Sequence, residues 1–168
     1  MASRILGGAK LKAELDKIAR GLKEGGTLRV GFLSGATYPD GKSVAMIAAI
    51  QEFGAPSKGI PSRPFFRNMI ATESAGWAPL LARQLKQSYD TKKALGRVGA
   101  VIAGELKQSI VDTNEPPLAP ATVAKKGFSK PLIDTAVLIN SIDFEVNDER
   151  YQGPRGYQAP AKRNGKRR

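Results

Sequence analysis

The chain has 168 residues, of which 41% are hydrophobic and 25% charged, a composition typical of a folded, soluble protein with one compact domain. Lysine and arginine number 27 against 15 aspartate and glutamate residues, which gives a formal net charge of +12. Cysteine and histidine are both absent, which excludes a disulfide scaffold, a thiolate nucleophile, a Ser-His-Asp triad and the histidine- or cysteine-ligated metal sites. The catalytic chemistry that remains is that of carboxylate pairs, lysine, tyrosine or a metal with oxygen ligands, so an enzyme is the less expected class and we expect no cofactor.

No stretch of the sequence reaches the run of about 18 apolar residues that a membrane-spanning helix requires. The first residues also lack the apolar region of a signal peptide. We expect a soluble protein that is made in a reducing cytoplasm and does not contact a membrane.

Four apolar residues recur at helical spacing near the start of the chain: Leu11, Leu15, Ile18 and Leu22. This spacing predicts an amphipathic helix over residues 9–23. Alternating apolar and polar side chains predict a strand over residues 27–33. A second helix is expected over residues 44–53, with Ser43 as its N-cap and Gly54 as its stop.

Prolines punctuate the middle of the chain. Residues 54–64 hold three prolines and two glycines, so we expect a stiff loop without regular structure. A helix is predicted to begin at Phe65 and to be interrupted near Gly76 and Pro79.

The clearest helical pattern covers residues 91–111, where large apolar residues recur at steps of three and four. A second stripe on this helix consists of small residues at steps of four: Gly96, Ala100 and Gly104. Small residues suit tight packing in the core, or the close approach of another helix or subunit.

Shorter elements complete the pattern. After a proline-rich turn at 114–120, short helices are predicted at 122–126 and 132–141, followed by a strand at 142–146. Together these elements predict an α+β fold, with a small antiparallel sheet packed against several helices, long proline-rich loops and a basic C-terminal tail. We expect a single domain over residues 1–150.

Half of the net charge lies in residues 151–168, which contain no acidic residue. The basic residues of this tail are Arg155, Lys162, Arg163, Lys166, Arg167 and Arg168. We expect the tail to be disordered in isolation, either as a solubilising segment or as a non-specific contact with nucleic-acid phosphates. The second possibility gives an alternative function, that of a basic nucleic-acid-binding protein acting through this tail.

Acidic residues gather near the last strand, where Asp143 and Glu145 share a face and Asp148 and Glu149 follow. Such a cluster can bind Mg²⁺ or act in acid–base catalysis, for example in a nuclease. A solvated strand face is the favoured interpretation, because a single strand supplies few convergent oxygens.

Two groups of residues in the middle of the chain resemble the signature of a phage morphogenesis family. They are Gln51-Glu52-Phe53-Gly54 and, after a short loop, Ile60-Pro61-Ser62-Arg63-Pro64-Phe65-Phe66-Arg67. Further segments follow in the family's order at 116–122, 125–127, 130–135 and 138–142. The family comprises the small tail-completion or head–tail joining (neck) proteins of tailed bacteriophages. One departure is Ala136, where the family usually has glycine.

The resemblance implies a non-enzymatic structural protein of the virion that completes the tail or joins it to the head. Its partners would be copies of itself in a ring, a hexamer if it follows the tail tube, together with the head–tail connector and the tail-tube or tail-terminator proteins. Non-specific contact with phage DNA is also expected. The protein would lie at the head–tail junction after assembly in the bacterial cytoplasm.

The resemblance also suggests an assembly interface made by Phe53, Arg63, Pro64, Phe65, Phe66, Arg67, Asp134 and Thr135. We expect Arg63 and Arg67 to pair with carboxylates of a neighbour, and one phenylalanine to close the core. The double variant Arg63→Glu with Arg67→Glu is then expected to stay folded but to fail in joining heads to tails. Asp134 or Thr135 is expected to cap the helix that follows.

Overall fold

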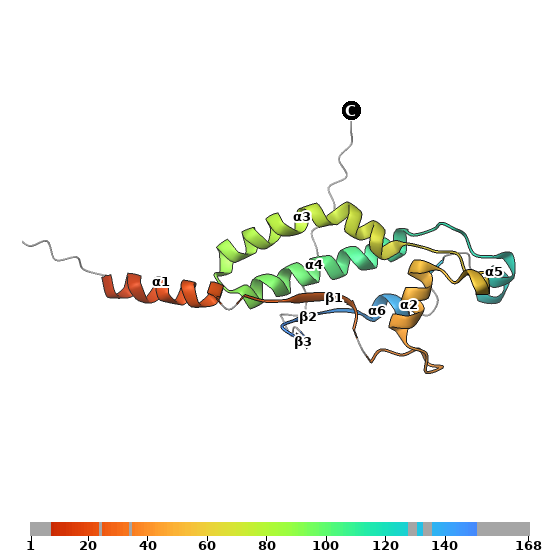
Figure 1. Ribbon diagram of the computed structural model, residues 1–168, viewed down its shortest axis with the longest axis horizontal. Coiled ribbons are helices and arrows are strands. Elements are labelled where there is room, and N and C mark those ends of the chain that lie inside the picture. The colour runs from red at the N-terminus through yellow and green to blue at the C-terminus, as the bar shows by residue number, and fades with distance from the viewer. Residues whose placement is uncertain (1–7, 24, 34, 128–130, 133–135, 151–168) are drawn as a thin grey trace, which may run out of the picture.

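The computed structural model describes residues 8–23, 25–33, 35–127, 131–132 and 136–150. The described elements are, in chain order, α1 (Gly8–Lys23), β1 (Leu28–Phe32), α2 (Val44–Phe53), the 3₁₀ turn η1 (Pro56–Lys58), α3 (Phe65–Ser88), α4 (Thr91–Asp112), α5 (Pro120–Lys126), α6 (Val137–Asn140), β2 (Ile142–Val146) and β3 (Glu149–Arg150) (Figure 1). The predicted α+β fold is confirmed.

The fold is layered, with α4 lying between α3 and the sheet (Figure 1). All strands are antiparallel, and β2 lies between β1 and β3. The register of the first pair runs from Leu28 opposite Val146 to Phe32 opposite Ile142. The sheet therefore joins the N-terminal part of the described chain to its C-terminal part.

The apolar stripe of α4 forms the centre of the core. The stripe residues Leu95, Val98, Ile102, Leu106 and Ile110 are all buried, as the spacing predicted. The sheet approaches α4 closely at Gly99, where a Cβ atom would lie 2.5 Å from the Phe144 ring. A glycine at this position therefore sets how near the helix lies to the sheet.

Local capping explains where two of the helices begin. The Ser43 hydroxyl accepts a hydrogen bond from the Met46 amide, and Gly54 ends α2 with φ of 78°, so both predicted signals of α2 are confirmed. The Asp90 carboxylate accepts from the Lys93 amide at 2.9 Å at the start of α4. This hydrogen bond, together with the side chain of Lys93, holds the pKa of Asp90 below its usual value.

The predicted interruption of the helix that starts at Phe65 is wrong, because α3 continues through both Gly76 and Pro79. Proline removes one backbone hydrogen bond and bends a helix, and α3 arches over α4 in Figure 1. Packing on α4 outweighs this local cost. Trp77, two residues before the proline, packs on the core and donates from Nε1 to a carboxylate oxygen of Glu105, 2.8 Å away.

Smaller corrections concern the short segments. The loop at 54–64 is not wholly irregular, since it contains η1 and an isolated bridge between Ala55 and Ile60. Of the helix predicted over 132–141, the described residues show α6 at Val137–Asn140, whose N-cap position is Ala136, with no side-chain hydrogen bond. The predicted caps Asp134 and Thr135 lie outside the described residues.

Within the described ranges, no helix combines the length and apolarity needed to cross a membrane.

Ala136 adopts a left-handed conformation, with φ of 59° and ψ of 3°. This conformation costs an alanine roughly 1–2 kcal/mol, whereas glycine adopts it freely but loses more entropy on folding. We expect Ala136→Gly to raise the free energy of unfolding by about 1 kcal/mol, measured by urea denaturation. The matched control is Ala71→Gly on the exposed side of α3, which should lower it by about 1 kcal/mol. A destabilised Ala136→Gly protein would contradict the left-handed cap.

Candidate assembly surface

The N-terminus of α3 is capped by a side chain from another helix. Pro64, at the N-cap position, makes no side-chain hydrogen bond. The buried carboxylate of Glu52, near the end of α2, instead accepts from the amide of Phe66 at 2.8 Å and from the amide of Arg67 at 3.2 Å. These amides would otherwise lack acceptors, because the first turn of a helix has none of its own. Glu52 therefore fixes α2 against α3.

Arg67 pairs with the same carboxylate. Its Nε lies 2.8 Å from Oε1 of Glu52, and its Nη2 donates to the Glu52 carbonyl at 3.0 Å. The guanidinium also lies over the ring of Phe53, 5.2 Å from the centroid. Arg67 remains more than half exposed and Phe53 is 66% exposed, so the two side chains form a joint surface feature.

Arg63 is an interior residue with only 4% of its surface exposed. Its Nη1 donates to the side-chain oxygen of Gln51 at 3.1 Å, while Nε and Nη2 donate to the carbonyls of Pro116 and Pro117 at 2.9 and 3.1 Å. Burial lowers the pKa of this guanidinium. The side chain thus ties the loop before α3 to the proline-rich loop after α4.

Further contacts close this part of the structure. Ser62 donates from its hydroxyl to the Glu52 carbonyl at 2.7 Å, and the amide of Arg63 donates to the Gln51 carbonyl at 2.7 Å. A Cβ atom on Gly54 would lie 2.8 Å from the Ser62 amide nitrogen. The end of α2 and the segment at Ser62 can therefore approach this closely only with glycine at position 54. We call residues 51–67, with Pro116 and Pro117, the Arg63 corner.

The structure separates the expected interface residues into two groups. Phe65 is buried in the core, and its carbonyl accepts from the Ser109 hydroxyl, while Pro64 and Phe66 are half-buried. Of the residues expected at the interface, Phe53 and Arg67 are the ones that the structure exposes. Asp134 and Thr135 lie outside the described residues, as do the expected DNA contacts from Arg155 to Arg168.

The interior position of Arg63 corrects its expected pairing with a carboxylate on a neighbour. All its side-chain hydrogen bonds in the structure go to neutral oxygens of its own chain. A glutamate there would face those same oxygens, so Arg63→Glu should disrupt the corner rather than leave the monomer folded. The double charge reversal therefore cannot serve as a clean test of assembly.

Sequence reasoning missed the exposed apolar face of α2. Met46 is half exposed and lies two turns before Phe53 on the same helix, and Ala45 and Ala49 are also exposed. The available signal was that α2 carries no charged residue before Glu52. Met46, Phe53 and Arg67 together define the surface that we call the α2 patch.

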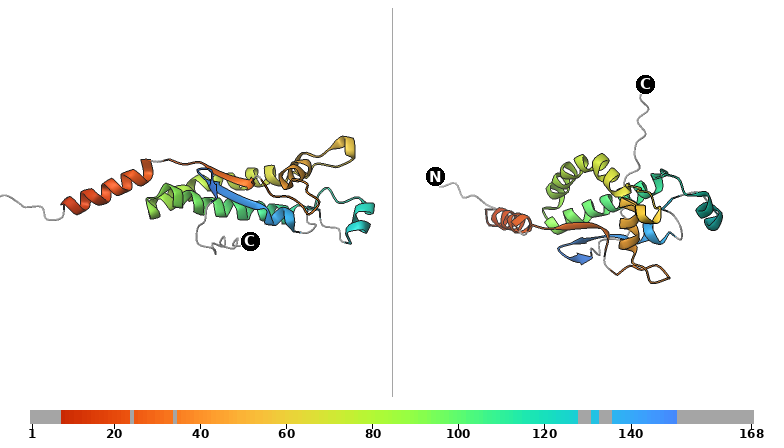
Figure 2. Two further views of the ribbon diagram at one scale, coloured as in Figure 1. Left: turned by 90° about the horizontal axis from the view of Figure 1, so that it is seen from below. Right: turned by 45° about the vertical axis from the view of Figure 1, so that its right-hand side comes forward.

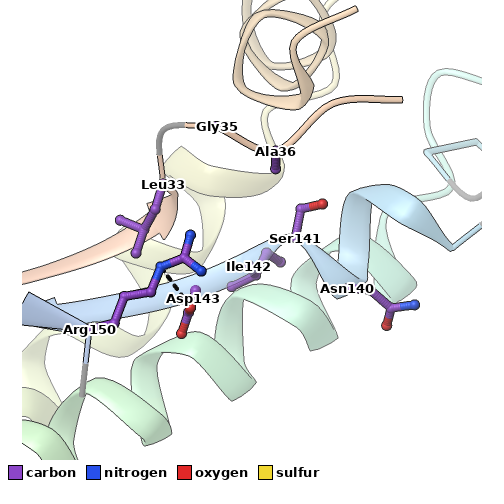
Figure 3. Close-up of a pocket in the computed structure, with 8 residues that line it drawn as sticks. All are labelled: Leu33, Gly35, Ala36, Asn140, Ser141, Ile142, Asp143 and Arg150. Atoms are coloured by element: carbon purple, nitrogen blue, oxygen red, sulfur yellow. Dashed lines mark ion pairs between the residues drawn. The ribbon is translucent and has the colours of Figure 1, made fainter. Parts of the chain in front are cut away.

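Three of the four acidic residues near β2 pair with a basic side chain. Figure 3 shows the ion pair between Arg150 and Asp143, with 3.7 Å between Nε and Oδ2, in a pocket beside β2. Asp148 pairs with Arg29, and Glu149 pairs with Lys92 at 2.6 Å. Among the residues that the structure describes, no group of three acidic side chains is placed to hold a metal ion.

Comparison with known proteins found no match among protein-family models, curated proteins or solved structures. The functional argument therefore depends on the motifs and on the geometry of the Arg63 corner.

Proposed function

We propose that the protein is a structural, non-enzymatic component of a tailed-phage virion that completes the tail or joins it to the head as a subunit of a ring. The observation that carries the proposal is the ordered set of motifs at 51–54, 60–67 and 116–122, which resembles the tail-completion and neck family. In space, these separate motifs meet at the Arg63 corner through the hydrogen bonds of Arg63 and Glu52.

The geometry of the corner supports a role in permanent contacts. Prolines and side-chain hydrogen bonds hold the backbone around the α2 patch, so little further ordering is needed when a partner docks. The patch offers methionine, phenylalanine and arginine, which are the residue types enriched at protein interfaces. We therefore place the contact with a neighbouring virion protein at the α2 patch.

Phe53→Ser provides the test, because Phe53 is exposed and its loss leaves the hydrogen bonds of the corner in place. We expect the variant to unfold at the same denaturant concentration as the wild type, but phage encoding it to yield unjoined heads and tails in electron micrographs. Tyr89→Ser, which alters an exposed aromatic residue at the far end of α3, is the matched control and should give normal particles. Normal particles from Phe53→Ser would remove the α2 patch from the proposal.

Cryo-electron microscopy of wild-type particles tests the role itself, with density for this chain expected as a ring at the head–tail junction. Absence of the chain from the particle would favour the second candidate, a basic nucleic-acid-binding protein, which the net charge of +12 supports. That candidate predicts binding to DNA or RNA that weakens steeply with salt and is lost when residues 151–168 are removed.

A further inference from the structure

Helix α1 is amphipathic but has no buried residue. Leu11 and Leu15 are 63% and 54% exposed, and Leu22 is also exposed. In Figures 1 and 2, α1 leads away from the layered body and touches it at its C-terminal end, where Thr91 donates to the Gly21 carbonyl. The sequence predicted the apolar stripe correctly, but within the part of the chain that the structure describes no surface covers it.

The charge on α1 is strongly positive. The helix contains five basic residues, Lys10, Lys12, Lys17, Arg20 and Lys23, and two acidic residues, Glu14 and Asp16. Its net charge is therefore +3, distributed around the exposed apolar stripe. A partner surface that suits α1 needs an apolar floor and acidic walls.

The body of the same chain carries a groove of that kind between α3 and α4. It has a volume of about 960 Å³, and its lining includes Val101 and Gly104. Gly104 belongs to the stripe of small residues, and without a side chain it leaves room for another helix. The acidic residues that line the groove are Glu73, Glu105, Asp112 and Glu115, and none of the described lining residues is basic.

We propose that α1 of one subunit docks in the α3–α4 groove of the next subunit. The stripe from Leu11 to Leu22 and the groove from Val101 to Asp112 each span 12 residues, about 17 Å along a helix. Length, apolar character and opposite charge therefore agree between the two surfaces.

The contact must join two chains. Gly21 of α1 lies against Thr91, where α3 meets α4. The groove lies toward the other end of this helix pair, where its lining residues fall between Asn68 and Glu73 on α3 and between Val101 and Glu115 along and just after α4. From Asn68 to Tyr89 the axis of α3 runs roughly 30 Å, and α1 points away from the pair (Figure 1).

Such a contact is head-to-tail, with one surface on each side of the subunit. Head-to-tail contacts close into rings when the rotation between neighbours permits. The ring, and its place in the virion, rest on the proposed function, whereas the docking itself follows from the two surfaces. The basic tail at 151–168 is a weaker candidate for the groove, because it contains no leucine, isoleucine or valine to match the apolar floor.

Disulfide cross-linking tests the contact cleanly, because the natural chain contains no cysteine. Chains carrying Leu15→Cys are mixed with size-tagged chains carrying Thr72→Cys, which lies in the groove, and the mixture is oxidised. We expect a mixed disulfide between the two kinds of chain, lost when Leu11→Asp is added to α1. The matched controls are Ala13→Cys on the opposite face of α1 and Ala82→Cys on α3 outside the groove, neither of which should cross-link.

Absence of the mixed disulfide at high protein concentration, or equal yields from the control positions, would overturn the inference. Preferential cross-linking of Thr72→Cys to Tyr157→Cys of the same chain would overturn it in favour of the tail. Rings at the head–tail junction without the α1 cross-link would reject this contact and keep the proposed function. If the cross-link forms but the protein is missing from particles, the contact is supported and the proposed function is rejected.

Discussion

Glu52→Ala should lower the free energy of unfolding by about 3 kcal/mol, although the carboxylate lies near the end of a short helix. Removing it leaves the amides of Phe66 and Arg67 without their acceptor, and each unsatisfied buried group costs about 1–3 kcal/mol. The partner charge on Arg67 is more than half exposed and stays hydrated, so its loss of pairing adds little. Chemical denaturation of the purified protein measures the change.

Arg67→Ala is the matched control, since it breaks the same ion pair from the exposed side. We expect it to cost less than Glu52→Ala, about 1–2 kcal/mol, because the carboxylate loses its cation but keeps both amide donors. Glu52→Gln should fall between the two, since one oxygen remains to accept. Equal losses from Glu52→Ala and Arg67→Ala would contradict the capping role and favour a simple ion pair.

Arg63→Lys is expected to lower the free energy of unfolding by about 3 kcal/mol, despite preserving the charge. The planar guanidinium reaches three acceptors, on Gln51, Pro116 and Pro117, and one ammonium group cannot reach them all. Partly buried oxygens left without a donor account for the cost. The loop at 113–120 should also lose its attachment to residue 63 and become more mobile. A protease of broad specificity should therefore cleave it sooner than the rest of the chain.

The control for Arg63→Lys is Arg83→Lys, which makes the same change on an exposed part of α3. We expect that variant to differ from the wild type by less than about 0.5 kcal/mol and to keep the wild-type pattern of cleavage. Wild-type stability in Arg63→Lys would show that the corner depends on charge and volume rather than on the directed hydrogen bonds.

The sequence alone predicts those parts of the fold that depend on local periodicity. The stripe of α4, the alternation in β1 and β2, and the cap and stop of α2 all follow from residues close together in the chain. The break at Pro79 was predicted from the same local rules and is wrong, because contacts of α3 with α4 outweigh the missing hydrogen bond.

The candidate site could be predicted only in part. Sequence patterns draw attention to Arg63 and Arg67, but both look like exposed arginines of a proline-rich segment. Arg63 is interior because it donates to backbone carbonyls 53 and 54 positions further along the chain. Every residue has a backbone carbonyl, so no sequence pattern shows which carbonyls will accept these hydrogen bonds. Likewise, the spacing in α1 predicts an apolar face but not whether that face lies inside the chain or outside it.

The pairing of β1 with β2 also governs how the chain folds as it is made. Phe32 and its partner Ile142 are 110 positions apart, so the sheet cannot form until almost all of the described chain has left the ribosome. At synthesis rates of about 5–20 residues per second the delay is on the order of 10 s. During that time α3 and α4 can pair locally, but the side of α4 that receives Phe144 and Leu28 at Gly99 has no cover. The nascent chain therefore presents an apolar helix face to chaperones for seconds before its own last strand arrives.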